Sequence, residues 1–383
     1  MRICHVTPHL PPDQGANAIL PAQLGAWQRA RGDVVSFVTH GTTQGGTRQE
    51  DPSIVVVPRR RGNRLSRLLR LDAMNVARAV NGALAAQALG PSDILHLHSN
   101  GVIIEAAARF ARGRGIPYVL TLYGTEIWHY RPRKPVDLFT AAYRGAAAIT
   151  FYSRGLRSRA IELNLDRPNL TVVFPAVGEA FQAQDAATRA RWREELGINE
   201  ARVILNVKRL HELAGQRFLI EAFGRIARDR RDVRLVICGT GSLRDSLEDQ
   251  SRALGIADRV TFTGLLLNDQ IARYSAVADV FALPSLLEAL PTVAVEALAA
   301  GTPVVSADHP GGLELHDLFG DDVAIVPKED APALAAALGS ALDAPRRVST
   351  STLAGIERLF RPAAVLEAYD AAYASARGGS KLS

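Results

Sequence analysis

Short apolar segments alternate with longer helical patterns along almost the whole chain, and this alternation constrains the fold more than any other feature. In the first half, the apolar segments are rich in Val, Ile and Leu, whereas the segments between them have a helical period. Strands that alternate with helices form βαβ units in a parallel sheet, and continuous apolar strands are typical of a sheet with both faces covered. The predicted strands are Arg2–Val6, Val34–Thr39, Ile54–Val57, Ile94–Leu97, Tyr118–Leu122 and Ala148–Phe151, and the predicted helices include Ile19–Arg31, Met74–Gln87 and Gly101–Gly113.

The second half repeats the same scheme after a linker that we place near Pro175–Ala187. We therefore predict an α/β protein with two Rossmann-like, doubly wound parallel sheets, in which ligands bind beyond the carboxyl ends of the strands. The predicted strands are Val203–Val207, Val233–Cys238, Val260–Thr263, Val280–Leu283 and Val304–Ser306; the predicted helices are Gly215–Ala227, Ser242–Leu254, Asn268–Ala276, Pro291–Ala300 and a tail helix, Ala363–Ala376.

The composition excludes several classes of protein. With 47% hydrophobic and 22% charged residues, the chain is composed like a soluble globular protein and unlike a disordered or fibrous one. Two cysteines, Cys4 and Cys238, cannot form a disulfide framework for 383 residues, which favours a cytoplasmic location. No apolar run reaches the roughly 18 residues of a membrane-spanning helix. The first residues lack the apolar core of a secretion signal.

The segment DVFALPSLLEALPTVAVEALAAGTPVVS, residues 279–306, carries the densest functional signals. A strand is followed by a loop, and Pro291 suits the first position of a helix that ends at Gly301, a residue that favours a left-handed cap. The helix N-terminus is a ready anion site, suited to a diphosphate. Glu288 and Glu296 lie eight residues apart, just over two helical turns, and such carboxylates can accept hydrogen bonds from ribose or sugar hydroxyls. Taken alone, the two would be ordinary solvated glutamates.

Cations and glycines follow two other strands of the second half. Lys208 and Arg209 come directly after one predicted strand and suit a pair of phosphates, since arginine offers a fork to two oxygens. Gly239 and Gly241 follow the next strand, where glycine is common in any turn from strand to helix. Without further context, solvated surface charges would explain the cations equally well.

Taken together, these residues resemble the retaining GT-B glycosyltransferases of family 4. The hallmark of this family is a pair of glutamates eight residues apart, within a segment that reads here as Pro284-Ser285, Glu288, Pro291, Glu296-Ala297, Ala299, Gly301 and Pro303-Val304-Val305. The resemblance covers nearly the whole chain, including DILHLH at Asp93–His98 and VVFPAVGEAF around Pro175–Phe181. It implies domains at 1–175 for the acceptor and 176–358 for the donor, with a helix in 359–383 that crosses back to the first domain.

The resemblance implies a transferase that moves a sugar from a nucleotide-sugar donor, a UDP-sugar first and a GDP-sugar second, to a glycan, lipid-linked or small-molecule acceptor. Glu296 would hold the ribose, Glu288 the sugar hydroxyls, and Arg209 the leaving phosphate, a charge stabilisation that would be the main catalytic contribution. Neither a cofactor nor a metal is expected. The donor-binding set is completed by Gly15, Ala16, Lys208, Gly239, Gly241, Leu290, Pro291 and Thr292.

The sequence departs from the family pattern at several positions. The family lysine five residues after the arginine is Ala214 here, so Lys208 is the candidate replacement, and the first glycine pair reads Gly15-Ala16. The HGTD segment of the family begins with Tyr123, which we place with Glu288 and Arg209 among the catalytic residues although tyrosine is a poor base at neutral pH. His98, Glu126 and His129 are the acceptor-side candidates. The substitutions are also compatible with a changed acceptor or an inactive relative.

The charge is distributed unevenly. Residues 1–175 carry 22 Lys and Arg against 11 Asp and Glu, whereas residues 176–383 carry 23 against 28. The basic segment is RRRGNRLSRLLRL, residues 59–71, and its leucines form an apolar stripe beside the arginines. Either an anionic membrane surface binds this segment or it is a solvated loop. Nucleic acid is not expected, because aromatic residues do not interleave with the arginines. The arginines proposed for membrane contact, on the inner face of the plasma membrane, are Arg59, Arg60, Arg61, Arg64, Arg67 and Arg70.

Two other functional classes stay open at this stage. One is a different enzyme on the same fold, such as a nucleotide-sugar epimerase or a sugar phosphorylase. The latter would need a lysine for pyridoxal phosphate, and Lys208, Lys328 and Lys381 are the only lysines of the second half. The other is a non-catalytic nucleotide-sugar-binding membrane scaffold. The donor, acceptor, linkage and oligomeric state are not specified by the sequence.

Overall fold

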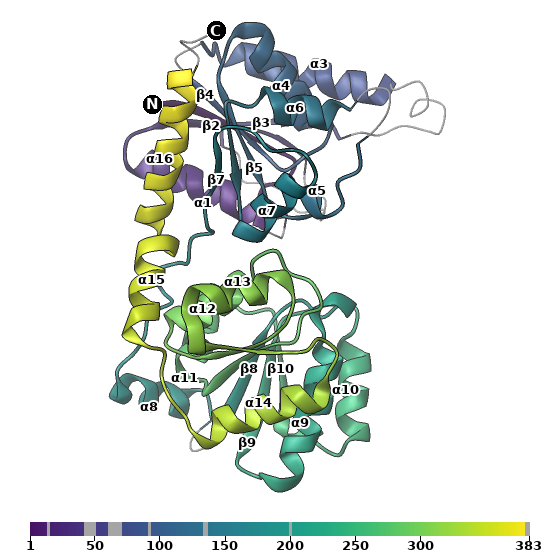
Figure 1. Cartoon of the computed structure of the whole chain (residues 1–383), viewed down its shortest axis with the longest axis vertical. Coiled ribbons are helices and arrows are strands. Elements are labelled where there is room, and N and C mark those ends of the chain that lie inside the picture. The colour runs from purple at the N-terminus through teal and green to yellow at the C-terminus, as the bar shows by residue number, and fades with distance from the viewer. Residues whose placement is uncertain are drawn as a thin grey trace. The chain divides into compact units, whose positions relative to one another are not determined.

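The structure is a computed structural model of the 383-residue chain, and it describes residues 1–13, 16–41, 51–59, 71–90, 93–132, 137–198 and 201–379. The chain divides into two compact units, each built around its own sheet (Figure 1). Unit 1 comprises Met1–Pro175 and Pro362–Ser383, and unit 2 comprises Ala176–Arg361. The last helix of the chain is therefore part of the first unit.

Unit 1 is a parallel sheet of seven strands, in the order β3-β2-β1-β4-β5-β6-β7, with helices on both faces. The strands are β1 (Arg2–Thr7), β2 (Val34–His40), β3 (Ile54–Val57), β4 (Ile94–His98), β5 (Tyr118–Leu122), β6 (Ala148–Phe151) and β7 (Leu170–Val172). The helices are α1 (Ala16–Ala30), α3 (Leu71–Ala86), α4 (Val102–Arg114), α5 (Thr125–Trp128), α6 (Leu138–Gly145), α7 (Arg154–Glu162) and α16 (Pro362–Gly379).

Unit 2 is a parallel sheet of six strands, in the order β10-β9-β8-β11-β12-β13. The strands are β8 (Arg202–Val207), β9 (Val233–Cys238), β10 (Val260–Gly264), β11 (Val280–Leu283), β12 (Val304–Ala307) and β13 (Val323–Val326). The helices are α8 (Ala186–Glu195), α9 (Gln216–Asp229), α10 (Arg244–Ala253), α11 (Asn268–Val277), α12 (Thr292–Ala299), α13 (Pro310–Phe319), α14 (Ala331–Asp343) and α15 (Thr350–Phe360), with 3₁₀ turns at η1 (Glu212–Ala214), η2 (Ala257–Arg259) and η3 (Gly320–Asp322).

These two sheets confirm the predicted fold class. In unit 2, apolar residues of α9 and α14 pack on one face of the sheet, including Leu219, Phe223, Leu334 and Leu338. In each sheet the strand order reverses next to the first strand, between β1 and β4 in unit 1 and between β8 and β11 in unit 2. Ligands of doubly wound sheets bind at such a switch point, beyond the carboxyl ends of the strands.

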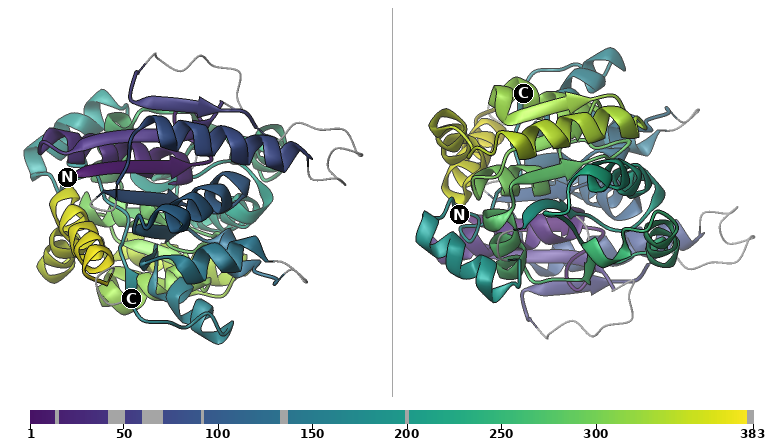
Figure 2. Two further views of the ribbon diagram at one scale, coloured as in Figure 1. Left: turned by 90° about the horizontal axis from the view of Figure 1, so that it is seen from above. Right: turned by 90° about the horizontal axis from the view of Figure 1, so that it is seen from below.

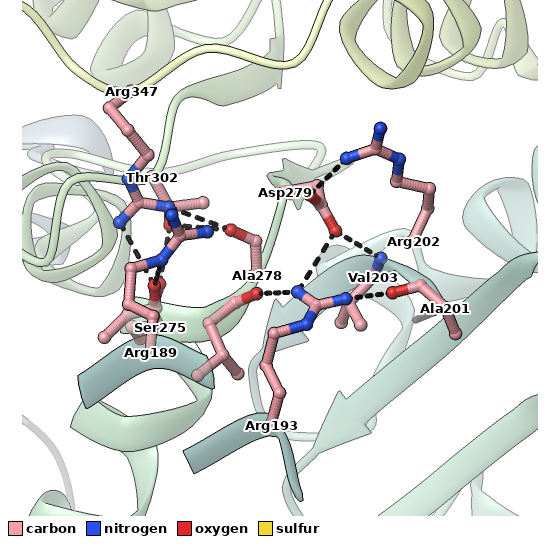
Figure 3. A network of polar contacts seen from close by, with 12 residues as sticks. Arg189, Arg193, Ala201, Arg202, Val203, Ser275, Ala278, Asp279, Thr302 and Arg347 are labelled. Carbon is pink, nitrogen blue, oxygen red and sulfur yellow. Dashed lines mark hydrogen bonds and ion pairs between the residues drawn. The ribbon is translucent and has the colours of Figure 1, made fainter. Parts of the chain in front are cut away.

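A cluster of arginines lies at the edge of the unit 2 sheet where the strands begin, opposite the carboxyl ends (Figure 3). Arg189 and Arg193 of α8, together with Arg347, donate to carbonyl groups at the end of α11, and cations are favoured at helix C-termini. Arg347 also lies against Gly301, whose φ of +87° confirms the predicted left-handed cap. Asp279 sits in the middle, accepting from the Val203 amide at 2.8 Å and pairing with Arg202 at 3.3 Å.

Helix α16 completes the core of unit 1. It packs against α1, β5 and β6 (Figure 2), and its Tyr373 hydroxyl accepts from the Gln28 amide at 3.0 Å. At the surface, Arg31 of the α1 end donates to Asp370 at 2.7 Å. None of the helices that the structure describes has both the length and the apolar character needed to cross a membrane.

Candidate functional site

The switch point of unit 2 brings together opposite charges from the two central strands. Lys208 follows β8, Glu288 lies in the loop after β11, and the Lys208 ammonium pairs with Oε1 of Glu288. About a fifth of each side chain is exposed, so the pair is accessible to a ligand and partly shielded from water. Because the pair bridges the two strands at which the sheet order reverses, it lies where the fold favours ligand binding.

Two further predicted residues are close to this ion pair in the sequence: Arg209 directly follows Lys208, and Glu296 lies on the helix after the Glu288 loop. Arg209 is exposed, and among the described residues its guanidinium makes no hydrogen bond or ion pair. Glu296 is half-buried on α12, and its carboxylate likewise lacks a partner in the described part of the chain. Burial raises the pKa of Glu296 to about 7, because the charged carboxylate loses hydration and gains no cation. Both groups are thus available to a ligand.

Glycines allow the loops at this edge to pack backbone against backbone. A Cβ on Gly239 would lie 2.1 Å from the Lys208 carbonyl oxygen, and a Cβ on Gly241 would lie 2.2 Å from that of Leu210. Gly215, with φ of +68°, would similarly collide with the Pro284 carbonyl. The contacts of Gly239 and Gly241 therefore position the loop that carries Lys208 and Arg209, and contact of these glycines with the donor stays a prediction.

The loop that carries Glu288 is fixed by its neighbours. The Leu286 amide donates to the Leu213 carbonyl at 2.8 Å, and the Glu288 carbonyl accepts from the Gly311 amide at 3.0 Å. Leu290 is buried in this loop, while Pro291 caps a helix that begins at Thr292, one residue later than predicted. The carboxylate position is thus set by backbone hydrogen bonds on two sides.

Two histidines of this region were missed by the sequence reasoning. His309 is fully buried, and its Nδ1 accepts from the Gly312 amide at 2.9 Å, so it caps α13. Burial lowers the pKa of His309 to about 4. Burial and then the charges of Arg209 and Lys208 lower the pKa of His211. The cap could have been predicted from the sequence, because His309 directly precedes Pro310, a residue type that favours the first position of a helix.

In unit 1, Tyr123 lies just beyond β5 and is half-buried. Its hydroxyl is 2.7 Å from Nδ1 of His98, and the two rings stack with 6.2 Å between their centroids. His98, the last residue of β4, is only 1% exposed. Tyr123 is therefore only partly exposed, and its hydroxyl contacts His98 in the core.

The other unit 1 candidates occupy different settings. Glu126 is buried, where it accepts from the Gly124 amide at 2.8 Å and from the Ser99 hydroxyl, so it holds the turn that follows β5. His129 is exposed at the end of α5. Gly15 lies outside the described residues, and Ala16 begins α1.

The basic segment is described only at its start. Arg59 pairs with Asp13 at 3.2 Å and donates to the Gly41 carbonyl at 2.8 Å, so it is tied into the unit 1 surface. The remaining arginines proposed for membrane contact, Arg60, Arg61, Arg64, Arg67 and Arg70, lie outside the described residues.

Both halves of the chain match glycosyltransferase families. Residues 188–352 match the glycosyl transferases group 1, and residues 15–176 match the glycosyl transferase 4-like domain. A 2-deoxystreptamine glucosyltransferase from Streptomyces kanamyceticus is 31% identical over 65% of this chain and 68% of its own length. A GDP-mannose-dependent alpha-(1-6)-phosphatidylinositol monomannoside mannosyltransferase from Mycolicibacterium smegmatis is 34% identical over 66% of this chain and 67% of its own length.

Solved structures share the fold over the full length. Sucrose-phosphate synthase from Thermosynechococcus elongatus matches with a TM-score of 0.77 at 20% identity, covering 99% of both chains. Anabaena Alr3699/HepE in complex with UDP-glucose matches with a TM-score of 0.73 at 16% identity, covering 98% of this chain and all of the other. The chain is a glycosyltransferase with the GT-B fold and belongs to the glycosyl transferases group 1.

Proposed function

We propose that this enzyme transfers a sugar from a nucleotide-sugar donor to a hydroxyl-bearing acceptor, with retention of anomeric configuration and without a metal ion. A UDP-sugar is the first candidate donor and a GDP-sugar the second. The observation that carries the proposal is the Lys208–Glu288 pair at the unit 2 switch point, with Arg209 directly after Lys208 in the sequence and Glu296 on helix α12, which follows the Glu288 loop. These residues offer cations for a diphosphate and carboxylates for hydroxyl groups within one strand edge.

The cations would act on the leaving group. When the bond between sugar and diphosphate breaks, negative charge grows on the diphosphate, and a group already placed to neutralise that charge lowers the barrier. The Arg209 guanidinium is exposed and can offer two parallel hydrogen bonds to phosphate oxygens. Lys208 supplies a second cation, which fits the position because buried Ala214 occupies the site of the family lysine.

The carboxylates would orient the donor. Glu296 would accept from ribose hydroxyls, and this contact would replace the hydration that burial has removed. Glu288 would accept from hydroxyls of the transferred sugar while Lys208 shifts toward the phosphate. Tyr123 remains the candidate catalytic residue of unit 1, and neither a cofactor nor a metal has a role in these steps.

Relatives support the substrate class and differ in its details. Their names specify GDP-mannose in one case, and the HepE structures contain UDP or UDP-glucose. The named acceptors include 2-deoxystreptamine and a phosphatidylinositol monomannoside. We propose a small-molecule, glycan or lipid-linked acceptor and a cytoplasmic location, with peripheral membrane contact through the basic segment.

The test combines a donor screen with one charge-neutral substitution. UDP-glucose, UDP-galactose, GDP-mannose and ADP-glucose are compared by thermal shift, because a ligand that binds only the folded state stabilises it. Glu288→Gln should then lower turnover of the donor found by about 10² or more without lowering the melting temperature. Glu221→Gln, which breaks an exposed ion pair with Arg225 on α9, is the control. Unchanged turnover in Glu288→Gln would remove Glu288 from the mechanism.

A further inference from the structure

The backbone that follows β8 is held from two sides. On one side, the amides of Lys208 and Leu210 donate to carbonyls of β9 and the loop after it, each at 2.9 Å, and so extend the ladder of the sheet. The carbonyl of Arg209, which lies between them in the sequence, accepts instead from the side-chain amide of Gln216 at 3.1 Å. Gln216 is the first residue of α9 and is only 1% exposed. A buried side chain therefore holds the main chain of the predicted phosphate-binding arginine.

Side-chain amides continue the sheet where the backbone pairing of its two central strands stops. The ladder between β8 and β11 covers two residue pairs. Asn206 comes directly after them on β8, and its Nδ2 donates to the Ala282 carbonyl of β11 at 2.9 Å. Gln216 then supplies the donor for Arg209, three residues further on. Because backbone carbonyls inside a protein need a donor, the two amides take the place of backbone N–H groups at the switch point.

The Ala282 carbonyl sets the orientation of both amides. It can only accept, so Nδ2 of Asn206 faces it, and Oδ1 of Asn206 lies 3.4 Å from Nε2 of Gln216. Nε2 of Gln216 thus has two acceptors, this oxygen and the Arg209 carbonyl. The amide oxygen of Gln216 is left buried without a hydrogen-bond partner in the described part of the chain. Reversing the Gln216 amide would set its oxygen against two other oxygens, so the observed orientation is the one that holds Arg209.

Stability alone does not account for a glutamine at this position. A buried oxygen without a partner loses its hydration and gains nothing in exchange, and an apolar side chain of the same volume would avoid this cost. The space is also tightly bounded, because a Cβ on Gly215 would lie 2.0 Å from the Pro284 carbonyl oxygen of the loop after β11. Gln216 therefore lies where the backbones beyond β8 and β11 meet, and its distinctive contribution is the contact with the Arg209 main chain.

Arg209 depends on its main chain for its position. Its side chain is exposed, and among the described residues its guanidinium has neither a hydrogen bond nor an ion pair. A cation that neutralises a leaving diphosphate is effective when it is already in place. We propose that Gln216, oriented by Asn206, is a positioning residue that fixes the Arg209 carbonyl and so places the guanidinium for the diphosphate of the nucleotide-sugar donor. This inference rests on the proposed function for its ligand, whereas the contact between Gln216 and the Arg209 carbonyl does not.

The effect of this contact on the loop is tested without ligand. Gln216→Met keeps the volume of the side chain and removes its donor, so the Arg209 carbonyl keeps only the His211 amide, at 3.1 Å. Hydrogen exchange of the full chain, read by mass spectrometry, should become about fivefold faster in peptides covering 207–213. Asn206→Leu removes the orienting oxygen and should act in the same direction, which keeps the test decisive if Gln216→Met does not fold. Unchanged exchange would overturn the inference.

The consequence for the ligand is tested by calorimetry with UDP against UMP, and with GDP against GMP. The ratio of the two affinities measures what the terminal phosphate contributes. Arg209→Ala should lower this ratio about tenfold, the loss of a hydrogen bond to a charged group, and Gln216→Met about fivefold. In the Arg209→Ala background, Gln216→Met should have no further effect, because it acts through Arg209. A full fivefold loss in that background would overturn the inference.

Gln250→Met is the matched control. It makes the same change in the same unit, where Nε2 of Gln250 donates to the Arg217 carbonyl at 2.8 Å, one residue beyond Gln216. It should leave both the exchange of 207–213 and the affinity ratio unchanged, and effects equal to those of Gln216→Met would overturn the inference.

The same measurements separate the inference from the proposed function. A loss of affinity ratio in Arg209→Ala that Gln216→Met does not share would contradict the inference alone. An unchanged ratio in Arg209→Ala would contradict the role of Arg209 in the proposed function. If neither UDP nor GDP binds the unaltered protein, the choice of donor fails, and the exchange of 207–213 still decides whether Gln216 holds the loop.

Discussion

The two sheets share one topology and place their polar residues in opposite ways. In unit 1, the switch-point strands β1 and β4 carry His5, His96 and His98 deep in the core. In unit 2, the corresponding strands β8 and β11 are apolar apart from Asn206 and the first residue of β8, Arg202, and the charges lie at the two edges. The doubly wound sheet therefore tolerates polar groups in its centre when each has a partner.

The two units therefore differ in where their polar side chains can be reached from solvent. Unit 2 offers charge directly, since Lys208, Arg209 and Glu288 lie on loops at the carboxyl edge. Unit 1 instead holds a hydroxyl, that of Tyr123, against the buried pair of His98 and His5. The predictions below test whether the sheets differ in this way, beginning with the largest effect.

Acid should unfold unit 1 before unit 2. The unfolded histidine pKa is near 6.5 and the folded pKa of His5 is about 4, so the unfolded state binds more protons between these values and stability falls as the pH falls. His5 alone accounts for about 3 kcal/mol at pH 4, and His96 and His98 act in the same direction. In unit 2, His309 has a similar shift. Hydrogen exchange read by mass spectrometry at pH 7, 6 and 5 should show unit 1 peptides losing protection first, and parallel loss in both units would contradict the comparison.

Asp279→Ala should destabilise unit 2 alone. The substitution leaves Arg193 and Arg202 without their carboxylate and the Val203 amide without its acceptor, which we expect to cost about 3 kcal/mol. Asp279→Asn is the milder control, because it keeps an acceptor for the amide. Urea unfolding with hydrogen exchange gives the loss for each unit. Equal loss in the two units would show that the arginine cluster is not local to unit 2.

Donor binding should depend on pH through Glu296. Its pKa of about 7 is raised by burial, and the charged form is the one that accepts from two hydroxyls. Affinity for the donor identified in the thermal screen should therefore fall about tenfold from pH 8 to pH 6. Glu296→Gln should bind weakly with no such slope. A slope that persists in this variant would assign the titration to another group.

The smallest expected effect concerns the basic segment of unit 1. Arg64→Ser should weaken sedimentation with vesicles of phosphatidylglycerol and phosphatidylcholine about fivefold, the loss of one cation near an anionic surface. Arg228→Ser removes an exposed arginine from α9 of unit 2 and should change nothing. Equal effects of the two substitutions would leave only non-specific attraction.

The fold could be predicted because parallel strands that are buried on both faces appear in the sequence as continuous runs of apolar residues. Ile54–Val57, Tyr118–Leu122 and Val280–Leu283 were predicted with the bounds that the structure shows. The strands β7 and β13 were not predicted. Both are short and lie at sheet edges, and their partly exposed residues give a weak pattern.

The site was predictable where one segment contains it. The spacing of Glu288 and Glu296 is visible in the sequence, but the contact of Glu288 with Lys208 depends on β8 lying beside β11. The histidine cluster was missed for the same reason. His96 and His98 are two residues apart on one face of β4, yet His5 joins them only because the register of β1 places it opposite His96.

The position of α16 has a consequence for how the protein is made. The helix emerges from the ribosome after all of Ala176–Arg361, yet its Tyr373 supplies bonds to Gln28 and His96 in the core of the first unit. At roughly 5–20 residues per second, unit 1 must wait about 10–40 s for this helix after its own strands are synthesised. The domain that is translated first is therefore completed last, and its histidine core stays open to water, chaperones and proteases during that interval.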